Sequence, residues 1–287
     1  MLKNKLIIFL LIIIFLFNII LKINKENFNQ SKYLMFTGSL GKYGISHHKS
    51  NLTKFILKAN ELNRVLIIPN FTLHGKHNSG KDITNNLSKY IDYNNLILND
   101  KKFRVIYKND EIKKIKSNDI MIYNLNQLQK DIKGDKGLIR FHEDFNLNGN
   151  IKFNNPKEII ELALKIKLKL KNYCCVHIRR NDRNNKNINI YTKSDNIIKK
   201  LKEINSPITV YIMTDEKNIN IFKKISEFYN VKYYFDFEEL NKIKQQDNYY
   251  LFQIENEIMN YSNKRISTFK TNNSYYHNYL VNKKGYQ

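Results

Sequence analysis

The prediction of the fold starts from the segment Cys174-Cys175-Val176-His177-Ile178-Arg179-Arg180-Asn181-Asp182. Residues 173–178 form an apolar, partly β-branched run of strand length, and two arginines, an Asn and an Asp follow where the strand should turn into a loop. In open α/β sheets, ligands bind outside the carboxyl ends of the strands, and planar guanidinium groups match phosphate oxygens. The stretch therefore predicts a sugar-nucleotide diphosphate site. The alternative is a solvated strand end with His177 as an ordinary core histidine.

The composition allows a large folded protein and does not by itself identify a partner. A chain of 287 residues with 42% hydrophobic and 13% aromatic residues can bury one large core or two cores of ordinary size. The net charge of +23 would suit nucleic acid, but lysines are scattered among acidic residues while Asn and Ile are abundant throughout. We therefore expect no nucleic-acid partner. Cys174 and Cys175 are adjacent and should point to opposite faces of a strand, so we expect no disulfide between them.

The N-terminus predicts a membrane anchor. Residues 6–21 are apolar except for Asn18, lysines flank them on both sides, and no small-residue cleavage pattern follows. We expect a short tail over residues 1–5, an uncleaved transmembrane anchor over residues 6–23 and a polar stem over residues 24–32. Positive charge is nearly equal on the two sides, so the loop charges do not decide the orientation.

The first folded lobe is expected over residues 33–170 and begins with a strand, a glycine-rich turn, a helix and a second strand. These elements are predicted at residues 34–37, 38–44, 48–62 and 65–68. Gly38 and Gly41 in the turn would let backbone amides approach a phosphate or sugar, although a plain tight turn has the same pattern. The rest of the lobe is expected to hold a helix at 85–90, strands at 105–107, 119–123 and 137–142, and a helix running from Asn155-Pro156 to Leu170.

The second lobe, residues 171–287, alternates strand and helix. After the strand at 173–178 we expect a loop at 183–191, helices at 195–204, 218–228 and 249–259, strands at 208–213 and 231–235, a short segment at 265–269 and a final helix at 274–281. Such alternation with short connections predicts a parallel, doubly wound sheet. The N-terminus of the final helix, at Ser274 and Tyr275, would suit a diphosphate.

Several segments together resemble a known family. The segment from Val176 to Asp182 resembles the His-x-Arg-Arg-Gly-Asp motif of the GDP-fucose-dependent fucosyltransferases, most of all the protein O-fucosyltransferases, with α1,2- and α1,6-fucosyltransferase relatives. Further segments are similar to motifs of that family and follow in its order, at residues 38–44, 59–69, 210–216 and 271–276. The resemblance spans Tyr33 to about Gly285.

The resemblance implies an α/β, GT-B-like fold of two Rossmann-like lobes preceded by a transmembrane helix. It implies inverting transfer of fucose from GDP-fucose to a hydroxyl of a protein or glycan acceptor, without a metal or another cofactor. The donor would bind the second lobe, and the acceptor side would lie in the first. A single-pass membrane protein of this kind is expected to be type II, with the catalytic domain in the lumen of the endoplasmic reticulum or Golgi if the source is eukaryotic or viral.

The resemblance also implies roles for particular residues. Arg179 or Arg180 would grip the β-phosphate and stabilise the leaving group, while His177 and Asp182 would orient the arginines or contact the sugar. Asp215 would lie by the guanosine or would cap a helix. The catalytic residues expected are Arg179, Arg180 and Asp182, and the donor-binding residues expected are His177, Asp215, Ser274, Tyr275, Gly38 and Gly41.

The sequence departs from the family pattern at two motifs. Asn181 replaces the glycine of the arginine motif, and Lys42-Tyr43 replaces the Asn-Gln that many relatives carry in the glycine-rich loop. This loop offers no carboxylate, so the catalytic base is unassigned, with His47, His48 and Asp182 as candidates by chemistry. The alternative function is a catalytically inactive, membrane-tethered relative that binds a glycan or a nucleotide.

Overall fold

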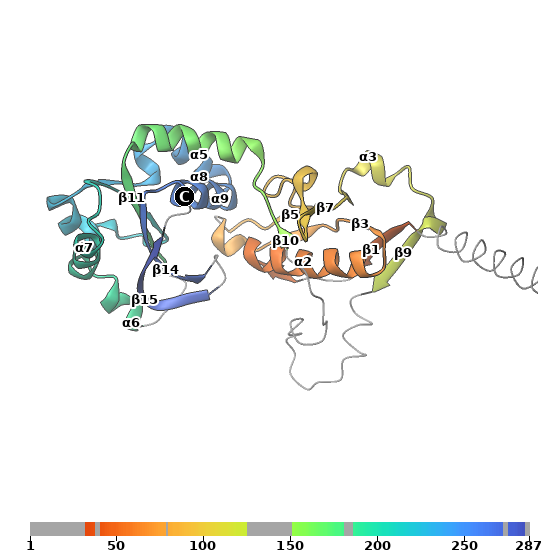
Figure 1. Ribbon diagram of the computed structural model, residues 1–287, viewed down its shortest axis with the longest axis horizontal. Coiled ribbons are helices and arrows are strands. Elements are labelled where there is room, and N and C mark those ends of the chain that lie inside the picture. The colour runs from red at the N-terminus through yellow and green to blue at the C-terminus, as the bar shows by residue number, and fades with distance from the viewer. Residues whose placement is uncertain are drawn as a thin grey trace, which may run out of the picture. The chain divides into compact units, whose positions relative to one another are not determined.

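The computed structural model describes residues 32–37, 41–78, 80–124, 151–180, 186–271 and 275–284. They form a mixed α/β protein with a mainly parallel sheet in each of two compact units, which confirms the α/β part of the predicted class (Figure 1). The first unit takes residues up to 41, 49–71 and 93–152, and the second takes 42–48, 72–92 and 153–287. The predicted anchor at 6–23 lies outside the described residues. None of the helices within those ranges combines the length and the apolar character needed to span a bilayer.

The sheet of the first unit and the helix beside it confirm the strands predicted at 34–37 and 65–68 and the helix predicted at 48–62, while residues 42–43 of the predicted turn form a short strand. Its strands follow the order β8 (Val105–Ile106), β3 (Val65–Ile67), β1 (Tyr33–Thr37), β9 (Ile120–Asn124), and all three pairings are parallel. Helix α2 (Ile45–Glu61) follows the glycine-rich turn and buries Leu52, Phe55, Ile56 and Ala59. These residues recur at helical spacing, so one stripe of α2 joins the core. The ring of Phe55 stacks on that of Phe36 in β1, with centroids 4.1 Å apart.

Smaller elements complete the first unit. Strands β6 (Ile97–Leu98), β7 (Lys101–Lys102) and β10 (Ile151–Lys152) form an antiparallel sheet, and the short elements are η2 (Tyr93–Asn95), α3 (Asn109–Ile112) and η3 (Ser117–Asp119). The strand expected at 137–142 lies outside the described residues.

The sheet of the second unit is built around the apolar run at residues 173–178. Its order is β13 (Asn230–Lys232), β12 (Thr209–Thr214), β11 (Tyr173–Ile178), β14 (Lys264–Thr271), β15 (Tyr275–Lys284). All pairings are parallel except that of β14 with β15. Every residue of β11 is buried, as expected for a central strand that is covered on both faces.

Helical elements cover the two faces of this sheet (Figure 1). One face packs against α5 (Lys157–Leu170), α8 (Glu238–Gln246) and α9 (Asn248–Asn260), and the other against α7 (Ser194–Glu203) and η4 (Ile219–Glu227). Cys175 belongs to the first layer and Cys174 to the second, and both thiols are free. The alternation expected of adjacent strand residues is thus confirmed.

The last element of the chain corrects a prediction. Residues 274–281 were expected to form a helix, but residues 275–284 form β15, which pairs antiparallel with β14. The tyrosines and valine of this segment favour an extended chain, and pairing satisfies the backbone groups along β14. Tyr275 therefore lies in a strand and not at a helix N-terminus, so the predicted helix-dipole site at this residue is wrong.

Other predicted elements differ in type or extent. The helix expected at 85–90 is strand β5 (Ile83–Asn85) followed by a turn, the helix at 218–228 is the 3-10 helix η4, and the strand at 231–235 is β13 followed by η5 (Tyr234–Asp236). The expected loop at 183–191 contains α6 (Lys186–Tyr191). Helix α5, placed at the end of the first lobe, belongs to the second compact unit.

Candidate functional site

The carboxyl ends of β11 and β12 bring the predicted arginines beside two carboxylates. The strands are parallel with Ile178 opposite Thr214, so Arg179 and Arg180 leave the sheet next to Asp215 and Glu216. The backbone therefore places the two arginines at this edge of the sheet, directly after a buried strand, as predicted.

Arg180 is held by both carboxylates. Its backbone N–H donates to Asp215 Oδ1 at 2.6 Å, and its Nε lies 3.3 Å from Glu216 Oε2. Both ion-paired side chains are only 14% exposed, so water screens their attraction weakly. Asp215 therefore anchors the loop that carries the arginines. It is not a helix cap, because Asn218 occupies the N-cap position of η4.

The charge of Arg179 acts on the phenol of Tyr249, and Tyr249 lies in the first turn of α9. Burial raises the pKa of the Tyr249 phenol to about 12, and the Asp82 and Asp247 carboxylates act in the same direction. The Arg179 guanidinium opposes them and favours the phenolate. The two arginines thus have different partners, since Arg180 pairs with Glu216 and the charge of Arg179 acts on Tyr249.

His177 is a buried member of the sheet. It is 4% exposed, and its Nδ1 lies 3.3 Å from Ser267 Oγ on the neighbouring strand β14. The register pairs these residues directly. This contact links the strand that carries the arginines to β14.

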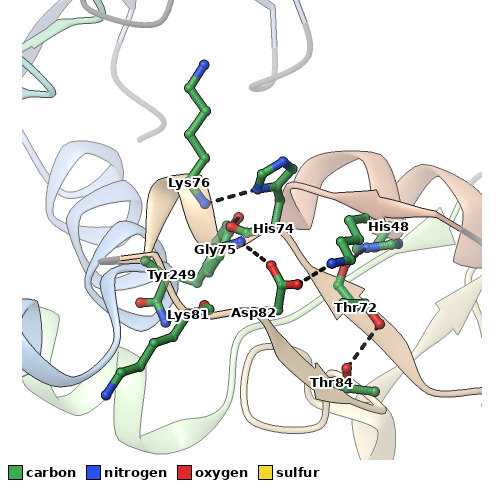
Figure 2. A network of polar contacts seen from close by, with 11 residues as sticks. His48, Thr72, His74, Gly75, Lys76, Lys81, Asp82, Thr84 and Tyr249 are labelled. Atoms are coloured by element: carbon green, nitrogen blue, oxygen red, sulfur yellow. Dashed lines mark hydrogen bonds and ion pairs between the residues drawn. The ribbon is translucent and has the colours of Figure 1, made fainter.

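A polar network from the 42–48 and 72–92 segments lies against α9 (Figure 2). Strands β2 (Lys42–Tyr43), β4 (Phe71–Leu73) and β5 form a small sheet, and η1 (Gly75–His77) follows β4. The Tyr249 hydroxyl donates to the His74 carbonyl at 2.8 Å. Asp82 Oδ1 accepts from the Gly75 N–H at 2.7 Å, and Asp82 Oδ2 lies 2.6 Å from Lys42 Nζ. The hydrogen bond from Lys42 holds the pKa of Asp82 below its ordinary value.

The turn from Gly75 to Asp82 requires glycine at its first position. A Cβ on Gly75 would come within 2.7 Å of the carbonyl group of Gly80, far inside van der Waals contact. The Gly75 carbonyl also accepts from the backbone N–H groups of Asn78 and Gly80. We expect Gly75→Ala to open this turn and lower the midpoint of thermal unfolding by several degrees, as about 1–3 kcal/mol of overpacking would. Gly44→Ala is the matched control, because a Cβ there meets nothing within 4 Å. Equal unfolding midpoints for the two variants would contradict the steric account.

A buried carboxylate joins the 72–92 segment to α9. Asp247 Oδ1 accepts from the Tyr250 N–H at 3.0 Å and so caps the helix. Its Oδ2 accepts from Lys89 Nζ at 2.6 Å and from the Tyr90 hydroxyl at 3.0 Å. We name these contacts the Asp247 clamp. No sequence motif predicted the clamp, because its two sides are more than 150 residues apart.

A second buried acid, Glu255, was also not predicted from the sequence. It occupies the apolar stripe of α9 beside Leu251 and Ile258, and Tyr211 donates to its Oε1 at 2.8 Å. Burial raises the pKa of Glu255 to about 7, although the Tyr211 hydrogen bond and the Lys244 charge act against this rise. The only available signal was a glutamate at a position where the helical period requires an apolar residue.

Of the other expected site residues, some lie within the residues that the structure describes and some lie outside them. Gly41 adopts a positive φ of 71°, which fits the predicted tight turn. Gly38, Asp182 and Ser274 lie outside the described residues. His48 is fully buried with Nε2 2.8 Å from the Thr72 carbonyl, and burial lowers its pKa, whereas His47 stacks on Tyr43 at 5.6 Å. His48 is therefore part of the packing and not an accessible base.

The described ranges contain no cluster of three or more His, Cys, Asp or Glu side chains arranged to hold a metal ion. The absence of a metal from the expected reaction remains a prediction that follows from the family resemblance.

Comparisons with known proteins find matches among solved structures alone. No protein-family profile and no curated protein sequence matches the chain. A structure of POFUT1 in complex with GDP-fucose is 13% identical, with 83% of this chain and 90% of that chain covered at a TM-score of 0.45. A structure of NodZ alpha-1,6-fucosyltransferase soaked with GDP-fucose is 11% identical, with 89% and 100% covered at a TM-score of 0.46. At such identity and TM-score, a function for this chain has to rest on its own residues.

Proposed function

We propose that the chain is a glycosyltransferase that transfers fucose from GDP-fucose to a hydroxyl group of a protein or glycan acceptor, with inversion and without a metal. The observation that carries the proposal is the pair Arg179-Arg180 at the carboxyl end of the central, fully buried strand β11. The order of motifs in the sequence supports the choice of donor.

The contacts of the two arginines favour different roles for them. Arg180 already has a counter-charge in Glu216, and a phosphate would have to displace that carboxylate. The guanidinium of Arg179 acts on the phenol of Tyr249. We therefore assign the diphosphate contact to Arg179, where charge develops on the leaving group, and a positioning role to Arg180.

Donor binding can be measured as thermal stabilisation of the full chain by GDP, GDP-fucose, UDP and UDP-glucose. A ligand present at 100 times its dissociation constant stabilises the folded state by about 2.7 kcal/mol. We expect GDP and GDP-fucose to raise the unfolding midpoint and the uridine nucleotides to leave it unchanged. Arg179→Ala should weaken GDP binding by about 10- to 100-fold, since a charged hydrogen bond contributes roughly 1.5–3 kcal/mol.

Arg180→Ala is the matched control, because it removes an equal charge from the neighbouring position. We expect a smaller loss of GDP affinity together with lower stability, since the Glu216 side chain, which is only 14% exposed, would lose its partner. If neither GDP nor GDP-fucose stabilises a folded wild-type chain, the transferase proposal is wrong. If the donor binds but no GDP is released with any acceptor, the inactive, nucleotide-binding relative is the better description.

A further inference from the structure

One face of the sheet in the first unit is left partly uncovered. The side chains of β1 alternate between buried and half-buried positions. Phe36, at a buried position, stacks on Phe55 of α2, so the half-buried positions form the face away from that helix. Strand β9 pairs with β1 in parallel and adds side chains to the same face. We name four apolar residues of this face the β9 patch: Tyr33, Met35, Ile120 and Ile122.

The exposure of the β9 patch increases toward the edge of the sheet. Ile122 lies on β9, the last strand in the order of this sheet, and is 62% exposed. Met35, which lies opposite Ile122, is half-buried, and Ile67 on the next strand is only 2% exposed. Parallel sheets are normally covered on both faces, and exposed apolar surface marks a contact with a membrane or another protein. The patch is therefore a candidate contact surface.

The chain itself provides a route to a bilayer. Residues 6–21 are apolar except for Asn18, and residues 22–32 connect them to Tyr33, the first residue of β1. The connecting residues reach about 40 Å at most when fully extended. A bilayer that holds residues 6–21 therefore stays within reach of the patch, at a far higher effective concentration than a second protein in solution.

The charges beside the patch do not select an anionic surface. Lys113, Lys114 and Lys116 are exposed and precede β9 by a few residues, but Asp110 and Glu111 lie in the same segment. Lysines beside an apolar surface can extend their ammonium groups to lipid headgroups while their aliphatic stems stay near the apolar layer. Apolar burial, and not charge, should therefore dominate a contact with lipid.

We propose that the β9 patch rests on the membrane surface, with Ile122 at the boundary between lipid headgroups and acyl chains. Amphipathic elements lie in this plane with their apolar side chains buried. The bilayer takes the place of the second layer that covers the outer face of parallel sheets. None of the residues at the arginine edge belongs to the patch, so this contact is independent of the proposed function.

The chain contains no tryptophan, so a single introduced tryptophan reports on its own surroundings. The test adds full-chain Ile122→Trp to phosphatidylcholine vesicles with and without brominated acyl chains, because bromine quenches tryptophan fluorescence only at short range. We expect lipid to move the emission maximum to shorter wavelength, and brominated lipid to quench most of the intensity. Added phosphatidylserine should change little.

Met121→Trp is the matched control. Neighbouring residues of a strand point to opposite faces, so a tryptophan at position 121 lies on the face of α2. It carries the same affinity of the indole ring for lipid, and we expect it to be quenched much less. Ile120→Trp, on the same face as Ile122, repeats the measurement if Ile122→Trp does not fold.

The other outcomes overturn the proposal. Equal quenching of Ile122→Trp and Met121→Trp, or quenching of neither, would show that the patch does not lie on lipid. An emission shift that depends on protein concentration and not on lipid would assign the patch to a second copy of the chain. Emission at short wavelength that is protected from iodide without lipid would assign it to a segment of the same chain. None of these results affects donor binding, which is measured separately with GDP.

Discussion

Replacement of Asp247 by alanine is expected to lower the free energy of unfolding by about 3 kcal/mol. The substitution removes the N-cap of α9, which contributes about 1 kcal/mol in typical helices. It also removes a charged acceptor from the Tyr90 hydroxyl, and Tyr90 is fully buried. A buried hydroxyl that loses such a partner costs roughly 1–3 kcal/mol. Urea unfolding of the full chain measures the sum.

Lys89→Met is the matched control for the Asp247 clamp. Its ammonium binds the same Asp247 oxygen, but the lysine side chain is 53% exposed whereas the aspartate is 6% exposed. Solvent screens an exposed partner, so we expect this variant to lose less than about 1 kcal/mol. If both variants lose the same small amount, the cap and the Tyr90 bond contribute little and the clamp is not a source of stability.

A pH-dependent stability is expected from Glu255. The pKa of Glu255 is raised from its ordinary 4.5 to about 7, so the folded state binds the proton more tightly than the unfolded state does. This stabilising contribution is complete below about pH 4.5 and is lost as the pH rises through about 7. The shift corresponds to about 3 kcal/mol between these limits. Urea unfolding at a series of pH values should show stability falling across this window.

Glu255→Gln keeps an oxygen for the Tyr211 hydroxyl and removes the titration. We expect the decline between pH 5 and 8 to flatten and the variant to be the more stable protein at pH 8. Tyr211→Phe tests the same site from the other side, because the phenol stabilises the ionised acid. It should move the midpoint of the decline to higher pH. An unchanged pH dependence in Glu255→Gln would exclude Glu255 as its source.

Local patterns in the sequence predicted the central strands of the two larger sheets and the placement of the arginines at a sheet edge, but not the two smaller sheets. The β11 run and the start of the chain from β1 to α2 have the periodicity of their elements, and each is confirmed with small shifts at the ends. The alternation of helix and strand predicts that the strands are parallel. The placement of Arg179 and Arg180 at the carboxyl edge of a sheet could therefore be predicted from the sequence alone.

The features that sequence reasoning missed depend on tertiary contacts. Lys89 contacts Asp247 and His74 contacts Tyr249 only because the 72–92 segment packs against α9, and no local period encodes this packing. The final segment was assigned to a helix because its antiparallel pairing with β14 is a tertiary contact that no local pattern shows. Glu255 was missed because the pattern that predicts buried helix positions counts only apolar residues, and a glutamate occupies such a position here.

The chain passes between its two units several times, and this affects how the protein can be made. Residues 42–48 and 72–92 belong to the unit that is otherwise built from residues 153–287. On the ribosome, Tyr90 emerges 157 residues before its partner Asp247. The early segment must therefore wait for most of the polypeptide to be synthesised, and contacts of such long sequence separation slow folding. No single cut in the sequence divides the protein into its two units.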